Sequence, residues 1–263
     1  MSAELEVLVE SPSRLAVQVA VADIARYDAV EEVAITLDGQ PCRWEEVPAP
    51  HGGRLWVIDV RSGLVSIGYD ATLTGRHPAP AADVADELTY LRPSRFCESD
   101  RMVGFASREF RAIEDPKAIL SAVSSWVGTH LEYISGSSGP TDGAVDTLLA
   151  GRGVCRDFAH LAVALLRAME IPARLAAVYA PGLDPMDFHA VAEAAIDGEW
   201  FVVDATLLAP RESLVRITTG RDAADTSFLS SYGGRVDIQW MSVTATVEGD
   251  LPIEDVHALT QLG

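Results

Sequence analysis

The chain has 263 residues, of which 48% are hydrophobic, so it is long and apolar enough for one large domain or two modest ones with a buried core. Aspartate and glutamate total 39 against 20 lysines and arginines, which gives a net charge of −19. Nucleic acids and anionic membrane surfaces bind basic patches, so this charge argues against both as partners. No run of about 18 apolar residues occurs, and we therefore expect no membrane-spanning helix.

The cysteines are too few and too widely spaced to form a disulfide framework or a zinc site. They are Cys42, Cys97 and Cys155, an odd number without a paired-ligand spacing. The first residues lack the basic and apolar regions of a secretory signal. We therefore expect a cytoplasmic protein with reduced thiols and without a metal or other cofactor.

The first part of the chain predicts a small antiparallel β domain. Short strand-like runs are separated by turn signals such as Asp38-Gly39 and Gly52-Gly53. A proline-rich stretch at 77–80 is typical of a linker. The sequence therefore predicts a β-sandwich-like domain over residues 1–80 and a second domain over residues 81–263. The predicted strands cover residues 4–9, 14–21, 33–37, 55–60 and 65–74.

The second part opens with a predicted helix over residues 115–134. Asp115-Pro116 supplies an N-cap followed by proline at the first helical position. Trp126 and Tyr133 could line a site or support an oxyanion, but packing in the core is the favoured role for both. A short helix over 146–150 is expected to follow.

A thiol at the start of the next helix is the main chemical signal. Cys155 follows Gly-Arg-Gly-Val, and apolar residues after it recur at spacings of three and four, which predicts a helix with one buried face that ends before Pro172. The unpaired N–H groups and positive dipole of a helix N-terminus favour a thiolate and could hold an oxyanion. The apolar positions are Phe158, Leu161, Ala162, Leu165, Leu166 and Met169.

An imidazole and a carboxylate follow in a predicted β-hairpin. Asp197-Gly198 is a strong two-residue turn signal between strand-like runs. That turn pairs Ile196 with Glu199, so His189 and Asp204 become diagonal neighbours on one face, within reach of a hydrogen bond. Such a bond would fix the tautomer of His189 and stabilise its protonated form. A slip of one residue in the register would separate the two side chains.

Two other interpretations of these residues are weaker. His160 lies five residues after Cys155, so a helix turns it away from the thiol, and a structural role is favoured. A metal site built from Cys155, His160 and His189 lacks any paired ligand motif. A thiol, a base and a residue that orients the base instead form a nucleophilic constellation.

These motifs in combination resemble the bacterial transglutaminase-like superfamily, whose members are often labelled cysteine proteases. The resemblance extends over about residues 88–240 and implies an α+β fold, with a papain-like transglutaminase core preceded by a small antiparallel β domain. It also implies a triad of Cys155 as nucleophile, His189 as general base and acid, and Asp204 as the orienting carboxylate. Val191 departs from the family, which often has tryptophan there, and this could alter the substrate groove. The matching segments are 90–100, 151–160, 171–174, 187–190, 200–206 and 220–225.

The sequence therefore predicts a cysteine-dependent acyl-transfer enzyme that acts on peptide or glutamine-type amides of a peptide or protein substrate. The expected reaction runs through a thioester at Cys155 and ends in hydrolysis, as in a peptidase or amidase. A protein-glutamine transglutaminase with an amine acceptor is the alternative within the same chemistry. A catalytically idle peptide-binding or scaffold module is the alternative from another class. The sequence carries no signal for an oligomeric state.

Overall fold

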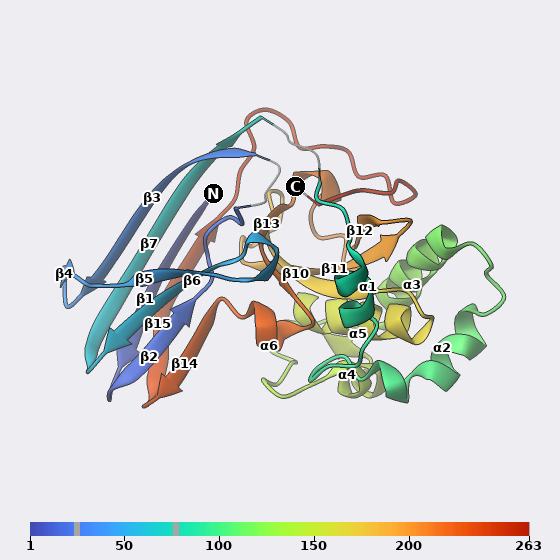
Figure 1. Cartoon of the computed structure of the whole chain (residues 1–263), viewed down its shortest axis with the longest axis horizontal. Helices are drawn as coiled ribbons and strands as arrows, with labels where there is room; N and C mark the ends of the chain where they lie inside the picture. Colours follow the sequence, from blue (N-terminus) through green and yellow to red (C-terminus); the bar gives the residue numbers. More distant parts are fainter. Residues whose placement is uncertain (24–26, 76–78, 263) are drawn as a thin grey trace.

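The computed structural model describes residues 1–23, 27–75 and 79–262, and has two lobes joined by a sheet (Figure 1). Strands of two β-sheets form one lobe and helices form the other, with β10–β13 between them. Helices and antiparallel sheets occupy separate regions, so the predicted α+β class is confirmed. The predicted linker at 77–80 lies largely outside the described residues.

The β lobe is a sandwich of two antiparallel sheets. One has the order β15-β1-β7-β3-β4 and the other the order β14-β2-β6-β5. Alternate residues of β1 and β6 are buried, as expected for strands that pack one face on a shared core. The strands are β1 Ser2–Val9, β2 Ser13–Val17, β3 Asp28–Leu37, β4 Gln40–Pro41, β5 Glu45–Pro48, β6 Arg54–Val60, β7 Gly63–Thr74, β14 Leu229–Gly233 and β15 Val236–Thr244.

The division of the chain at residue 80 needs a correction. The five predicted strands are present, but β14 and β15 return from the end of the chain to the same two sheets. β15 pairs with β1, and β14 pairs with β2. β1 and β2 are therefore inner strands of their sheets, with backbone partners on both sides. The sandwich is therefore built from both ends of the chain.

The helical lobe packs on one face of a four-stranded antiparallel sheet of order β12-β11-β10-β13. The 115–134 helix is shorter than predicted, because α3 ends at His130 and the chain turns into the short strand β8. Its predicted N-cap is confirmed, since Asp115 accepts a hydrogen bond from the N–H of Lys117. The elements are α1 Val84–Tyr90, α2 Val103–Phe110, α3 Pro116–His130, β8 Glu132–Tyr133, α4 Ala144–Ala150, β9 Arg152–Gly153, α5 Cys155–Ala168, β10 Ala173–Tyr179, β11 His189–Ile196, β12 Glu199–Val203, β13 Val215–Gly220 and α6 Ala223–Thr226.

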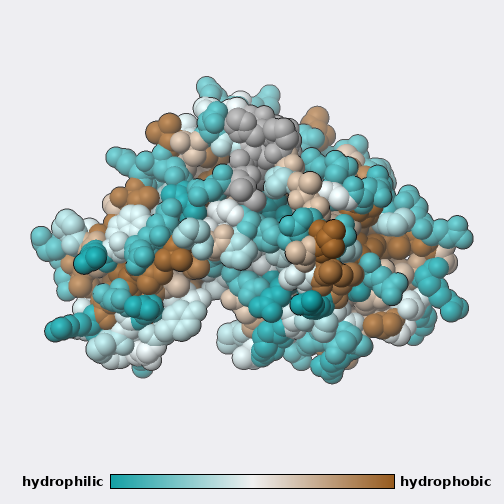
Figure 2. Space-filling model, in the orientation of Figure 1, coloured by the Kyte–Doolittle hydropathy of each residue, from teal (hydrophilic) through white to brown (hydrophobic). Residues whose placement is uncertain are grey.

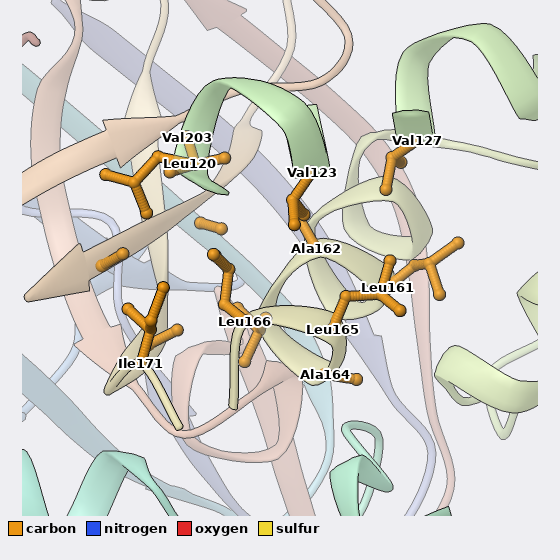
Figure 3. Close-up of a cluster of buried hydrophobic side chains, with 14 of the residues drawn as sticks. Leu120, Val123, Val127, Leu161, Ala162, Ala164, Leu165, Leu166, Ile171 and Val203 are labelled. Atoms are coloured by element: carbon orange, nitrogen blue, oxygen red, sulfur yellow. The ribbon is translucent and has the colours of Figure 1, made fainter. Parts of the chain in front are cut away.

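Helix α5 is the centre of the helical lobe. Its whole length after the first two residues is buried, between α3 and α4 on one side and the sheet on the other. Figure 3 shows Ala162 of α5 beside Val123 of α3, in one buried cluster with Leu161, Leu165 and Val127. Because α5 is enclosed on all sides, the position of its first residue, Cys155, is fixed by the core.

The two lobes share part of one hydrophobic core. Tyr179 of β10 and Ile217 of β13 pack among the buried residues of the sandwich. The Tyr179 hydroxyl donates to the carbonyl of Val19 at 2.8 Å, and the N–H of Ala22 donates to the carbonyl of Arg216 at 3.0 Å. The sandwich is therefore a fixed wall beside the sheet.

A buried ionic cluster lies in the same sheet. Glu193 of β11 is completely buried and accepts hydrogen bonds from Arg174 of β10 at 2.9 Å and from Arg216 of β13 at 2.6 Å. Arg174 also stacks on the ring of Trp200, 3.6 Å from its centre. Burial alone would raise the pKa of Glu193, but the two guanidinium groups hold it at about 2.

Hydrophilic residues cover most of the face seen in Figure 2, with hydrophobic residues scattered over both lobes. In the part of the chain that the structure describes, no helix is both long enough and apolar enough to cross a membrane.

Candidate active site

Cys155 is the first residue of α5, as the sequence predicts. Asp157 fixes this end of the helix, since one carboxylate oxygen accepts from the N–H of Val154 at 2.8 Å and the other accepts from Ser138 Oγ at 2.8 Å. Gly153 lies against Asp157, and a Cβ at that glycine would be 2.6 Å from the Asp157 Cβ. Gly153 and Asp157 therefore jointly determine the position of the half-buried thiol of Cys155.

The hairpin after α5 has the predicted register. Ile196 pairs with Glu199, and the strands run on to bring the imidazole beside the carboxylate. His189 Nε2 and Asp204 Oδ2 are 3.0 Å apart, and both side chains are about 1% exposed. Thr206 holds the second carboxylate oxygen through its N–H at 2.8 Å and its hydroxyl at 2.7 Å. Both oxygens of the Asp204 carboxylate therefore have hydrogen-bond partners, and these bonds orient the carboxylate toward the imidazole.

This pair is held in its charged form. Burial alone would lower the pKa of His189, but the Asp204 carboxylate and the nearby Cys155 thiol raise it to about 10. Burial alone would raise the pKa of Asp204, but His189 and the hydrogen bonds from Thr206 keep it below its usual value. The imidazole is therefore protonated at neutral pH.

The second nitrogen of His189 is the one left for the thiol. Nε2 is bound to Asp204, while Nδ1 is buried without a hydrogen bond of ordinary geometry. Cys155 interacts with the same imidazole closely enough to raise its pKa. A protonated imidazole beside a cysteine favours the thiolate form, which is the nucleophilic one. The three residues predicted from the sequence are thus brought together.

A cavity of about 420 Å³ opens at this site. Cys155, His189 and Asp187 line one part of it, and the remainder is mostly apolar. Among the described residues, no cluster of three or more His, Cys, Asp or Glu side chains could hold a metal ion.

Comparisons with known proteins identify the family of this chain. Residues 104–205 match the model of the transglutaminase-like superfamily. The structure of a "Putative Cysteine Protease" from Cytophaga hutchinsonii is 34% identical, covers 98% of this chain and 94% of its own, and superposes with a TM-score of 0.89. The chain belongs to the transglutaminase-like superfamily. Uncharacterized protein ML0607 of Mycobacterium leprae is 30% identical over 162 residues, which cover 58% of this chain and 57% of that relative.

The resemblance predicts that Val191, where the superfamily often has tryptophan, alters the substrate groove, but the structure places this side chain in the core. Val191 is 1% exposed and packs in a core cluster with Val178 and Val202, away from the cavity lining. Replacement of the family tryptophan by valine therefore changes core packing, because this side chain does not line the cavity.

Tyr133 was expected to pack in the core, but it lies at the transglutaminase-like site. Its strand β8 pairs with β9, which places Tyr133 opposite Gly153, two residues before Cys155. The ring contacts Phe158 with centres 5.8 Å apart, and the residue is 44% exposed. Partial burial and the neighbouring Cys155 raise the pKa of Tyr133, and its hydroxyl interacts with both the backbone N–H and the thiol of that cysteine. No sequence period reveals this contact, because a two-residue parallel bridge creates it.

Trp126 does pack in the core, where its ring contacts Phe105 and Phe110. His160 is structural, as expected. It is completely buried, accepts the N–H of Ala223 at 3.1 Å and stacks on Phe96. Burial lowers the pKa of His160 to about 4, so it is neutral at neutral pH. His160 thus supports two residues that line the cavity.

Proposed function

We propose that this protein is a cysteine-dependent acyl-transfer enzyme that attacks an amide of a peptide or protein substrate and resolves the thioester with water. The observation that carries the proposal is the buried His189–Asp204 pair, 3.0 Å apart, beside a cysteine at a helix N-terminus that opens on a cavity. Membership in the transglutaminase-like superfamily supports the same chemistry.

In the first half of the proposed reaction, the Cys155 thiolate attacks the amide carbon. The S–C bond forms and the carbonyl electron pair moves to oxygen. The backbone N–H of Cys155 and the Tyr133 hydroxyl, which interact with each other in the resting site, are the proposed donors to this oxyanion. The C–N bond then breaks as His189 gives its proton to the leaving amine, which leaves a thioester and a neutral imidazole.

In the second half, the neutral imidazole takes a proton from water as the water attacks the thioester. The C–S bond breaks, the acid leaves, and the thiolate–imidazolium pair is restored. Asp204 stays ionised throughout and stabilises the protonated imidazole.

Three free thiols, each in the described part of the chain, fit a reducing compartment such as the cytoplasm.

The test uses a denatured protein digest as a mixed peptide substrate, analysed by mass spectrometry with and without a primary amine such as monodansylcadaverine. We expect new carboxyl termini or deamidated glutamines in the parent and none with Cys155→Ala. Amine-labelled glutamine in place of hydrolysis would make the protein a transglutaminase. Identical peptide patterns for the parent and Cys155→Ala would refute the enzyme and favour a binding module.

A further inference from the structure

The cavity at Cys155 is lined by side chains from both lobes. The four-stranded sheet supplies Leu175 and Ala177 from β10 and Ile217 from β13. The segment after α6 supplies Phe228, and the sandwich strand β15 supplies Met241. These residues come from distant parts of the chain, yet all of them are apolar and border one space. The return of β15 to the sandwich therefore completes a surface of the site.

Gln18 holds in place the segment of the cavity wall that carries Phe228. Its side-chain amide donates to the carbonyls of Asp225 at 3.1 Å and Ser227 at 3.3 Å, and its oxygen accepts from Thr218 Oγ1 at 2.9 Å. Gln18 also donates its backbone N–H to the carbonyl of Phe228 at 2.9 Å. The side-chain amide of Gln18 is therefore hydrogen-bonded within the protein, and Gln18 holds Phe228 at the cavity.

Two aromatic rings narrow this space next to the imidazole. Phe188, the residue before His189, stacks on Phe228 with ring centres 5.2 Å apart at 26°. The volume of about 420 Å³ lies within the range of ordinary ligand sites, roughly 300–1,000 Å³. It is a preformed apolar cavity whose border contains the nucleophile.

We propose that this cavity binds a bulky apolar side chain of the substrate, within two residues on the acyl side of the amide that Cys155 attacks. The acyl part is the half of the substrate that stays bonded to the sulfur, so it is the half that a cavity bordering Cys155 can hold through both steps. This inference rests on the proposed function and specifies its substrate class. Burial of a leucine- or phenylalanine-sized side chain favours binding about 10- to 100-fold over glycine.

Peptide aldehydes test the proposal without a known substrate. The thiol adds to the aldehyde carbon, the S–C bond forms, and the carbonyl oxygen takes the proton to give a reversible hemithioacetal. The probes are N-acetyl-glycyl-glycinal, N-acetyl-phenylalanyl-glycinal and N-acetyl-glycyl-phenylalaninal, with affinity measured by protection of Cys155 against iodoacetamide. We expect at least one phenylalanine probe to bind 10-fold or more tightly than the glycine probe.

Variants that alter the cavity volume sharpen the test. Ala177→Leu should fill the cavity and reduce the preference for phenylalanine to within about threefold, whereas Ala34→Leu, at an exposed position of β3, should retain it. Phe228→Ala, a second variant that does not depend on overpacking, should weaken binding of the phenylalanine probes more than binding of the glycine probe.

The outcomes separate the two proposals. Equal affinities of all three aldehydes in the parent would overturn the apolar cavity alone, because Cys155 would still form adducts. A preference that survives in both cavity variants would overturn it as well. Absence of any aldehyde adduct at Cys155 would overturn the proposed function, and this inference with it.

Discussion

Two buried ionic sites lie on the same strand, β11, and differ in how completely their polar atoms are paired. At Glu193, the carboxylate is enclosed by Arg174 and Arg216, and its oxygens accept from both. At His189, only one ring nitrogen is paired, and the other is buried without a hydrogen bond of ordinary geometry. Both sites have strongly shifted pKa values.

A shifted pKa alone therefore does not identify a functional group. The Glu193 cluster is closed and satisfied, as expected of a structural ion network. The His189 site borders a cavity, faces a cysteine and retains an unused nitrogen, so its charge is available for chemistry. The following predictions separate the two sites, beginning with the largest expected effect.

Loss of the imidazole should have the largest effect on chemistry. We expect His189→Ala to lower the rate of Cys155 acylation by an activated amide about 10²- to 10⁴-fold, because both proton transfer and stabilisation of the thiolate are lost. Release of the leaving group and intact mass report the rate. His130→Ala, an exposed histidine of α3, is the control. Equal rates for the parent and His189→Ala would remove this residue from the mechanism.

Loss of the buried carboxylate should instead affect stability. Glu193→Ala leaves two buried guanidinium groups without their partner, so we expect the free energy of unfolding to fall by about 3–5 kcal/mol. Urea denaturation measures it. Glu199→Ala, at an exposed position of β12, should change it by less than about 0.5 kcal/mol. A loss of alkylation at Cys155 in folded Glu193→Ala protein would contradict the separation of the two sites.

Removal of the Tyr133 hydroxyl should slow reactions that form an oxyanion more than it changes simple alkylation of the thiol. We expect Tyr133→Phe to slow amide acylation about 10²-fold, the order of effect for one lost oxyanion donor, and to change alkylation by iodoacetamide much less, although the hydroxyl also contacts the thiol. Tyr232→Phe, at an exposed position of β14, is the matched control. Faster acylation would mean that the phenol occupies the oxyanion position in the resting protein.

The two buried histidines should give opposite dependences of stability on pH. The pKa of His189 is raised to about 10, so its contribution is complete below about 6.5 and is lost as the pH rises through 10. The pKa of His160 is lowered to about 4, so its contribution is present above about 6.5 and is lost as the pH falls through 4.

Each proton can change the free energy of unfolding by at most about 1.4 kcal/mol per pH unit. Urea denaturation from pH 4 to 10 should therefore show the acid-side decline reduced in His160→Gln and the alkaline-side decline reduced in His189→Gln. Unchanged profiles in both variants would show that neither imidazole is perturbed by folding.

Short-range patterns in the sequence are enough to predict the local features of the site. Helical periodicity after Gly153 placed Cys155 at a helix start, since short-range spacing decides where a helix begins and which face it buries. The turn at Asp197-Gly198 set the hairpin register, because a two-residue turn leaves little freedom in strand pairing. His189 and Asp204 followed from that register.

The distant segments that complete the site are set by packing between elements far apart in the chain. β14 and β15 return to the sandwich and pair with β2 and β1, and no local pattern encodes which strand edge a distant segment will join. Tyr133 reaches Cys155 through a two-residue bridge, and Met241 reaches the cavity through β15. These contacts depend on packing between elements far apart in the chain, whereas periodicity and turn chemistry describe only neighbours in sequence.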